Sequence, residues 1–287
     1  MEYDKIIALI KREVVPAVGC TEPVAVALCA SVAAEALQAE PDEISVRLSA
    51  NMLKNAMGVG IPGTGMIGLP IAVVLGALVG KPEDELEVLK SVTPADVERG
   101  KAYLASHRVD IALESDNDEK LYIEVEMHAA GHSSRAVISG SHTFVSRVER
   151  DGVVLRDALS SGDGDCDAVD VELTLRMVYD FAMTVPVEKI EFISEAARLN
   201  MAAAETSFNG DYGHGLGRIL RHDNELRIMG DTLFSRILAY TSGACDARMS
   251  GAMVPVMSNS GSGNQGIAAT VPVVVYGREC GASHEQM

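Results

Sequence analysis

The segment at residues 258–266 reads SNSGSGNQG, and six of its nine side chains can form hydrogen bonds. Its three glycines let the backbone approach a ligand closely. The segment follows an apolar run at 252–257 and opens a small-residue segment at 267–276, which predicts a loop at a helix N-terminus. Outward N–H groups at such a position bind anions, so we expect a site for a carboxylate or a phosphate. The candidate binding residues are Ser258, Asn259, Ser260, Ser262, Asn264 and Gln265.

Two GxGxxG patterns, at residues 58–63 and 261–266, suggest a dinucleotide site at first sight. That fingerprint requires a strand before it, a helix after it and an acidic residue about 20 positions further on. The run before Gly58 is not β-rich, Pro62 lies inside the pattern, and the chain ends soon after Gly266. We therefore reject the nucleotide interpretation for both.

Cys20 lies in the sequence GCTEP at residues 19–23, at the start of a predicted helix in which Thr21 or Glu22 provides the cap. A helix N-terminus lowers the pKa of a thiol and favours the thiolate, which can act as a nucleophile or a metal ligand. The alternative is a buried cysteine used as a small apolar residue. Both interpretations stay open on the residues alone.

Asn51, Lys54 and Asn55 have helical spacing between a predicted strand and a glycine turn. They could hold a carboxylate and an amino group, and a lysine with a lowered pKa could act as a general base. A solvated helix face is the alternative. Arg248 precedes the polar loop and could pair with a carboxylate or form a structural ion pair. His128, His132 and His142 fall in a β-rich region, where the four-residue spacing of the first two does not make a metal site.

The composition limits the functional classes. With 24 basic and 41 acidic residues the formal charge is −17, which disfavours nucleic acids and anionic membranes as partners and favours a cytoplasmic protein. The N-terminus has no apolar signal core, and glycine and proline interrupt the long apolar stretch at 59–80. The five cysteines form no CxxC pair, which is typical of free thiols in a reducing compartment.

Apolar periodicity predicts an α+β fold. We expect a mostly helical domain formed by both ends of the chain, residues 1–42 and 159–287, with an α+β domain at 43–158 inserted between them around an antiparallel sheet. A capping-box sequence at 283–286 is followed by no helix, which suggests that polypeptide is missing after Met287. The expected helices lie at 3–15, 24–37, 69–79, 83–90, 94–107, 173–183, 187–206 and 231–247, and the expected strands at 43–50, 109–113, 121–127, 134–139 and 143–148.

Three motifs resemble the L-cysteine desulfidase family, which is related to the iron–sulfur-dependent L-serine dehydratase α chain. They are GCTEP at 19–23, NMLKN followed by GIPG within 51–63, and DARM at 246–249 leading into the polar loop. The resemblance covers essentially the whole chain. It implies a lyase that converts L-cysteine to pyruvate, ammonia and sulfide in amino-acid catabolism, without pyridoxal phosphate.

The same resemblance implies site residues and a cofactor. The family holds a [4Fe-4S] cluster with three cysteines, and Cys20 matches the first of these ligands. Lys54 is then the candidate base, and the substrate would be held by Glu22, Asn51, Asn55, Arg248 and the polar residues of the loop. Family members continue past Met287, and their other two cluster cysteines lie in that later part. The chain is therefore expected to be truncated or to be completed by a separate chain, and a homo-oligomer is a further alternative.

Two other functions stay open. One is an L-serine dehydratase, or a dehydratase of a related amino acid, with the same cluster. The other is an amino-acid-binding fragment without a cluster, because one cysteine cannot hold a [4Fe-4S] centre.

Overall fold

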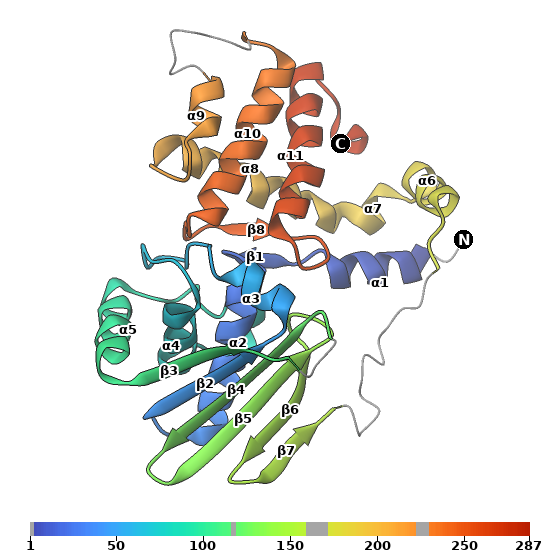
Figure 1. The fold of residues 1–287 in the computed structure, drawn as a ribbon. Helices are drawn as coiled ribbons and strands as arrows, with labels where there is room; N and C mark the ends of the chain where they lie inside the picture. Colours follow the sequence, from blue (N-terminus) through green and yellow to red (C-terminus); the bar gives the residue numbers. More distant parts are fainter. Residues whose placement is uncertain (1–2, 116–118, 159–171, 222–229) are drawn as a thin grey trace. The chain divides into compact units, whose positions relative to one another are not determined.

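The computed structural model describes residues 3–115, 119–158, 172–221 and 230–287. The chain divides into two compact units (Figure 1). The sheet unit comprises residues 17–166 and 249–253, and the helical unit comprises residues 1–16, 167–248 and 254–287. The predicted α+β class is confirmed. No helix among the described residues is long and apolar enough to cross a membrane.

A six-stranded sheet in the order β3-β2-β4-β5-β6-β7 is the centre of the sheet unit (Figure 1). The pairs from β2–β4 to β6–β7 are antiparallel, as expected. The β2–β3 pair is parallel, which corrects the expectation of a purely antiparallel sheet. A parallel pair needs a crossover connection, and here three α-helices lie between the two strands in the sequence. The strands are β2 (Glu43–Leu48), β3 (Arg108–Leu113), β4 (Tyr122–Ala129), β5 (His132–Ser139), β6 (Val145–Arg150) and β7 (Val153–Asp157).

Helix α2 (Thr21–Leu37) covers the apolar face of this sheet and is buried around nearly its whole circumference. Its other side packs against α4 (Leu69–Val79), where a Cβ on Gly76 would lie 2.2 Å from the Ala27 carbonyl oxygen. Such a close crossing requires the small residues in which α2 is rich. The sequence analysis placed residues 17–42 in the helical domain, whereas contacts place residues 17–42 in the sheet unit. A helix that is apolar all round has no solvent face, so it lies between two layers.

The remaining helices of the sheet unit are α3 (Ala50–Ala56), the 3-10 helix η1 (Pro82–Glu87) and α5 (Pro94–Ser106). Thr93 caps α5 in a capping box with Asp96. The helix expected at 83–90 is instead a 3-10 helix broken at Glu85, whose φ is 46°. That positive φ is incompatible with a continuous α-helix.

The helical unit contains α8, α10 and α11, which are its longest helices. The expected helix at 187–206 is divided into α7, the 3-10 helix η2 and α8, whereas the capping box at 283–286 is confirmed. The buried amide of Asn200 bonds both the N–H and the carbonyl of Met257, which fixes strand β8 against α8. The chain passes from the helical unit to the sheet unit within the short strand β1 (Pro16–Val18). The other bounds are α1 (Tyr3–Glu13), α6 (Leu175–Thr184), α7 (Val187–Ile190), η2 (Glu191–Ile193), α8 (Ser194–Asn209), α9 (Leu216–Arg221), α10 (Leu233–Met249), β8 (Pro255–Met257), α11 (Gly263–Cys280) and η3 (His284–Gln286).

Candidate functional site

Cys20 is the N-cap residue of α2, a position that the sequence analysis assigned to Thr21 or Glu22. Its side chain makes no capping hydrogen bond to the helix. The thiol instead donates to the Met249 thioether, with a sulfur–sulfur distance of 3.3 Å, and Cys20 is 2% exposed. The sulfur thus lies at the positive end of a 17-residue helix.

The backbone around Cys20 is fixed by two loops. Gly60 N–H donates to the Met249 carbonyl, and Gly63 N–H donates to the Gly251 carbonyl, both at 3.0 Å. Gly19 has a φ of +79°, and a Cβ there would lie 2.4 Å from Cγ of Pro62. These contacts bring together three motifs that are far apart in the sequence, at residues 19–23, 60–63 and 249–251.

Glu22 and Asn55, two of the predicted substrate-binding residues, are brought together beside this helix end. Asn55 Nδ2 donates to Glu22 Oε1 at 3.3 Å, and the Thr21 hydroxyl donates to Glu22 Oε2 at 3.1 Å. A carboxylate in the first turn of a helix also interacts favourably with the helix dipole. The pair offers a carboxylate and an amide oxygen, which are groups that accept hydrogen bonds from an ammonium group.

Asn51 and Lys54 lie on the same short helix as Asn55, and both are exposed. Helix α3 packs against α2, so it positions this polar face beside the start of α2. The structure thus agrees with the helical spacing that the sequence predicted for the three residues.

His142 is a residue of this region that the sequence analysis missed, because it was grouped with His128 and His132. Burial lowers the pKa of His142 from its ordinary value of 6.5, and the electrostatic influence of Glu22 opposes that shift. The imidazole is therefore neutral at pH 7 and can accept a proton. No pattern in the sequence relates positions 22 and 142, since their proximity is a product of the tertiary fold.

The other two histidines have separate partners. His128 pairs with Glu126 at 3.1 Å and His132 with Asp151 at 2.9 Å. Across the described residues, no group of three or more His, Cys, Asp or Glu side chains could hold a metal ion. Cys29 is fully buried, and its thiol donates to the Ala136 carbonyl at 3.4 Å, so this cysteine belongs to the core.

In the helical unit, the polar loop at 258–266 lies at the N-terminus of α11, as predicted. Ser262 is the N-cap residue, and its hydroxyl accepts from the Gln265 N–H at 3.3 Å. Arg248, which is 4% exposed, donates to Asn264 Oδ1 at 2.9 Å. A Cβ on Gly263 would lie 2.2 Å from Arg248 Nε, so the guanidinium lies directly against the first residue of the helix. Arg248 thus adds a buried positive charge to the positive end of α11.

The serines of the loop have structural partners. Ser258 is fully buried, and its hydroxyl donates to the Val15 carbonyl at 2.7 Å. Ser260 has a φ of 48°, and its hydroxyl donates to the side chain of Asn259 at 3.1 Å. Gln265 is exposed, and Asn264 is half-buried beside Arg248. The helix amides at the start of α11, with Arg248 of α10 beside them, can therefore bind an anion, while Ser258 and Ser262 stabilise the loop.

The chain is similar to known proteins over its whole length. A family model described as "Serine dehydratase alpha chain" matches residues 83–287. A UPF0597 protein of Bacteroides fragilis is 61% identical over 287 residues, which are 100% of this chain and 67% of that protein. A UPF0597 protein of Bacteroides thetaiotaomicron is 57% identical over 286 residues, with 100% and 67% coverage. One from Porphyromonas gingivalis is 48% identical over 288 residues, with 98% and 66% coverage.

The chain therefore belongs to the serine dehydratase alpha-chain family. It spans about two thirds of the length of these relatives, at 67% of the first. No solved structure matches it.

Proposed function

We propose that the protein is an amino-acid lyase that eliminates the β-substituent of a small L-amino acid, with L-cysteine as the substrate. Membership of the serine dehydratase alpha-chain family supports the lyase class. The observation that carries the proposal is the position of Cys20, whose thiol lies at the positive end of α2, two residues before Glu22, which accepts a hydrogen bond from Asn55. A cysteine used only for packing would not need to lie at an N-cap position, where Ser, Thr, Asp and Asn are preferred.

The proposed reaction is a β-elimination followed by hydrolysis. A base removes the α-proton, the carbon–sulfur bond breaks, and the electron pair leaves on sulfur as hydrosulfide. The resulting aminoacrylate rearranges to an imine, which takes up one water molecule to give pyruvate and ammonium. The chain must therefore bind an ammonium group and provide a base near the α-carbon.

Side chains of the sheet unit can perform both tasks. Glu22 and Asn55 provide acceptors for the ammonium group, with Asn51 on the same helix. Lys54 is the candidate base from the sequence, and His142 is the candidate base from the structure, because its pKa is lowered by burial and its ring is neutral at pH 7. In this proposal the loop at 258–266 and Arg248 bind an anionic group, as their positions at the start of α11 suggest.

The iron–sulfur cluster implied by the resemblance requires three cysteine ligands. Within the described residues Cys20 is one suitable thiol, but no second and third ligand lie near it. The residues described here thus do not form a complete site for the cluster. We assign Cys20 as a ligand only within this proposal, and the roles of Glu22, Asn55 and the base do not depend on it.

L-Serine is the second candidate substrate, because the family description names serine dehydratase. The same residues would serve both reactions, since only the leaving group differs. An assay under anaerobic conditions that measures sulfide from L-cysteine and pyruvate from L-serine separates the two. Greater kcat/KM for L-cysteine supports the desulfidase, and greater kcat/KM for L-serine supports the dehydratase. Turnover of neither amino acid would refute the lyase and favour a cluster-free binding protein.

The two candidate bases can be distinguished by substitution. The variant that removes the base should lower kcat by about 100-fold or more, because general base catalysis contributes effects of this size. Lys54→Ala and His142→Gln are the test pair, and Lys101→Ala on the exposed face of α5 is the control. If both test variants keep the wild-type rate, the base lies elsewhere in the protein.

A further inference from the structure

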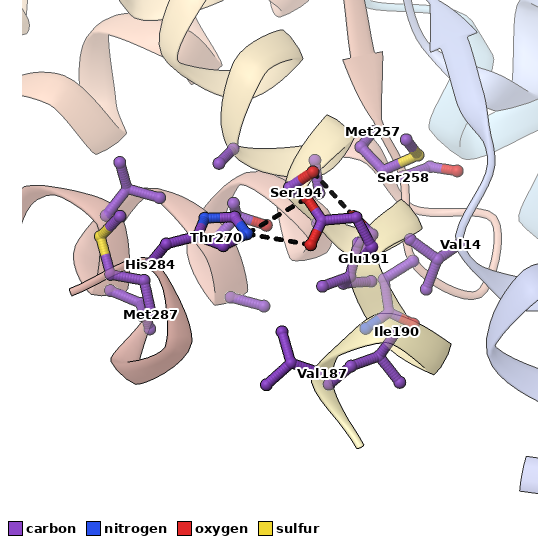
Figure 2. A pocket seen from close by; sticks show the side chains of 18 of the residues that line it. Val14, Val187, Ile190, Glu191, Ser194, Met257, Ser258, Thr270, His284 and Met287 are labelled. Atoms are coloured by element: carbon purple, nitrogen blue, oxygen red, sulfur yellow. Dashed lines mark hydrogen bonds and ion pairs between the residues drawn. The ribbon is translucent and has the colours of Figure 1, made fainter. Parts of the chain in front are cut away.

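The helical unit contains an apolar pocket with a volume of about 410 Å³ (Figure 2). Residues from α7, η2 and α8 form one wall, and residues from α11 and η3 form the other. Aliphatic side chains dominate the lining, and several of them are open to solvent: Val273 is 49% exposed, Met287 49% and Ile193 40%. Burial of such exposed aliphatic surface by a partner is energetically favourable, because it removes apolar area from water.

Several polar groups that line the pocket bond to one another. His284 Nε2 lies 2.9 Å from one Glu191 carboxylate oxygen and 3.1 Å from the other, as Figure 2 shows. The Ser194 hydroxyl donates to the Glu191 backbone carbonyl at 2.7 Å. Pockets for small polar molecules have a few polar groups directed at the ligand. Here the main polar groups are paired already, which favours an apolar occupant.

The shape of the lining favours a polypeptide segment. Ala196 and Ala197 on α8 face the pocket from one wall, and Gly266 and Ala269 on α11 face it from the other. Small residues on two helices let a third helix approach closely and place its larger side chains between them. Glu285 adds an acidic group to the lining, which complements a basic residue beside the apolar face of such a helix.

The lengths of the relatives indicate where such a helix comes from. The Bacteroides fragilis protein aligns with this chain over 67% of its own length, so about a third of it has no counterpart in these 287 residues. A similar fraction is unaligned in the Porphyromonas gingivalis protein, which is covered over 66%. Family members therefore contain polypeptide that packs somewhere and for which this structure shows no partner.

We propose that this pocket is the docking site for an amphipathic helix from the part of the family's polypeptide that has no counterpart in this chain. Its apolar side chains enter the pocket that α8 and α11 line, and a basic residue at its edge lies beside Glu285. Met257, Ser258 and Asn259 also line the pocket, so the docked helix would stabilise the beginning of the polar loop. This inference does not depend on the role of Cys20 or on the substrate.

The test uses the unaligned third of the Bacteroides fragilis protein, co-expressed with this chain and quantified as a complex by analytical ultracentrifugation. We expect a one-to-one complex, and Val273→Asp should weaken it by about 30-fold or more, as loss of a central interface residue does. Val178→Asp on α6 is the matched control, since Val178 is 47% exposed and does not line the pocket. Absence of a complex, or an equal effect of both variants, would overturn the proposal.

A second measurement applies if the separate segment does not fold. A cysteine is placed at Val273 in this chain and at the aligned position of the full-length Bacteroides fragilis protein, and both are labelled with a maleimide. We expect labelling in the full-length protein to be at least about 10-fold slower, because the docked helix covers the position. Equal labelling rates would contradict the proposal. Wild-type self-association that Val273→Asp abolishes would identify a second copy as the occupant instead.

Discussion

Helices α2 and α11 begin differently, because the side chains of their N-cap residues have different partners. Each helix begins at a residue with a short polar or thiol side chain, and each leaves amide groups at its positive end. In α11 the Ser262 hydroxyl accepts from the Gln265 N–H, so the side chain stabilises its own helix. In α2 the Cys20 side chain makes no capping bond and lies against the Met249 thioether. Local helix stability explains Ser262, whereas it does not explain a cysteine at position 20.

The largest effect on stability is expected at the start of α11, where packing leaves no space. A Cβ on Gly266 would lie 2.0 Å from the Met257 carbonyl oxygen. Gly266→Ala must therefore move β8 or the helix, and we expect it to lower the free energy of unfolding by about 3 kcal/mol. Urea denaturation followed by circular dichroism measures this change. Gly58→Ala is the control, because no atom lies within 4 Å of the added Cβ; equal losses in both variants would contradict the packing argument.

Substitution of each N-cap residue in turn tests the difference between the two helix starts. Ser262→Ala removes a capping bond and should lower the free energy of unfolding by about 1 kcal/mol. Cys20→Ser introduces a better capping residue at α2, so the free energy of unfolding should not fall. Thermal and urea denaturation of the two variants give the answer. A loss in Cys20→Ser as large as that in Ser262→Ala would show that the thiol has a structural role.

A smaller, pH-dependent effect is expected at the His284–Glu191 contact in the pocket. The hydrogen bond to Glu191 raises the pKa of His284 above its ordinary value of 6.5. This contact therefore stabilises the folded state fully below pH 6.5, and its contribution is lost as the pH rises through the raised pKa. An NMR titration of His284 should give a midpoint above 6.5, and Glu191→Gln should return it toward that value. An unchanged midpoint in Glu191→Gln would exclude the ion pair as the cause.

Much of the fold could be predicted from local pattern. The helix at residues 69–79 was predicted with the bounds that α4 has, because a continuous apolar run between two glycines defines it. The capping box at 283–286 and the helix after the polar loop were also recognised from short-range signals. The parallel β2–β3 pair and the position of α2 were not, since both depend on which distant segments pack together.

The candidate site shows the same limit. The motif at 19–23 and the spacing of Asn51, Lys54 and Asn55 were visible in the sequence. The contact between Cys20 and Met249 could not be predicted, because the two residues are 229 positions apart and no periodicity relates them. His142 was assigned to a group of histidines by sequence proximity, whereas the fold places it under the influence of Glu22. Residue types predicted the chemistry, but tertiary structure determined which residues share a site.

The most direct test of the account is the rate of sulfide release from L-cysteine by Cys20→Ser, measured anaerobically beside the wild type and Cys280→Ser. Cys280 is exposed at the end of α11, so its substitution controls for general loss of a thiol. We predict that Cys20→Ser loses activity by about 100-fold or more without loss of stability, while Cys280→Ser keeps the wild-type rate. Wild-type activity in Cys20→Ser would contradict the central claim that this thiol serves the reaction.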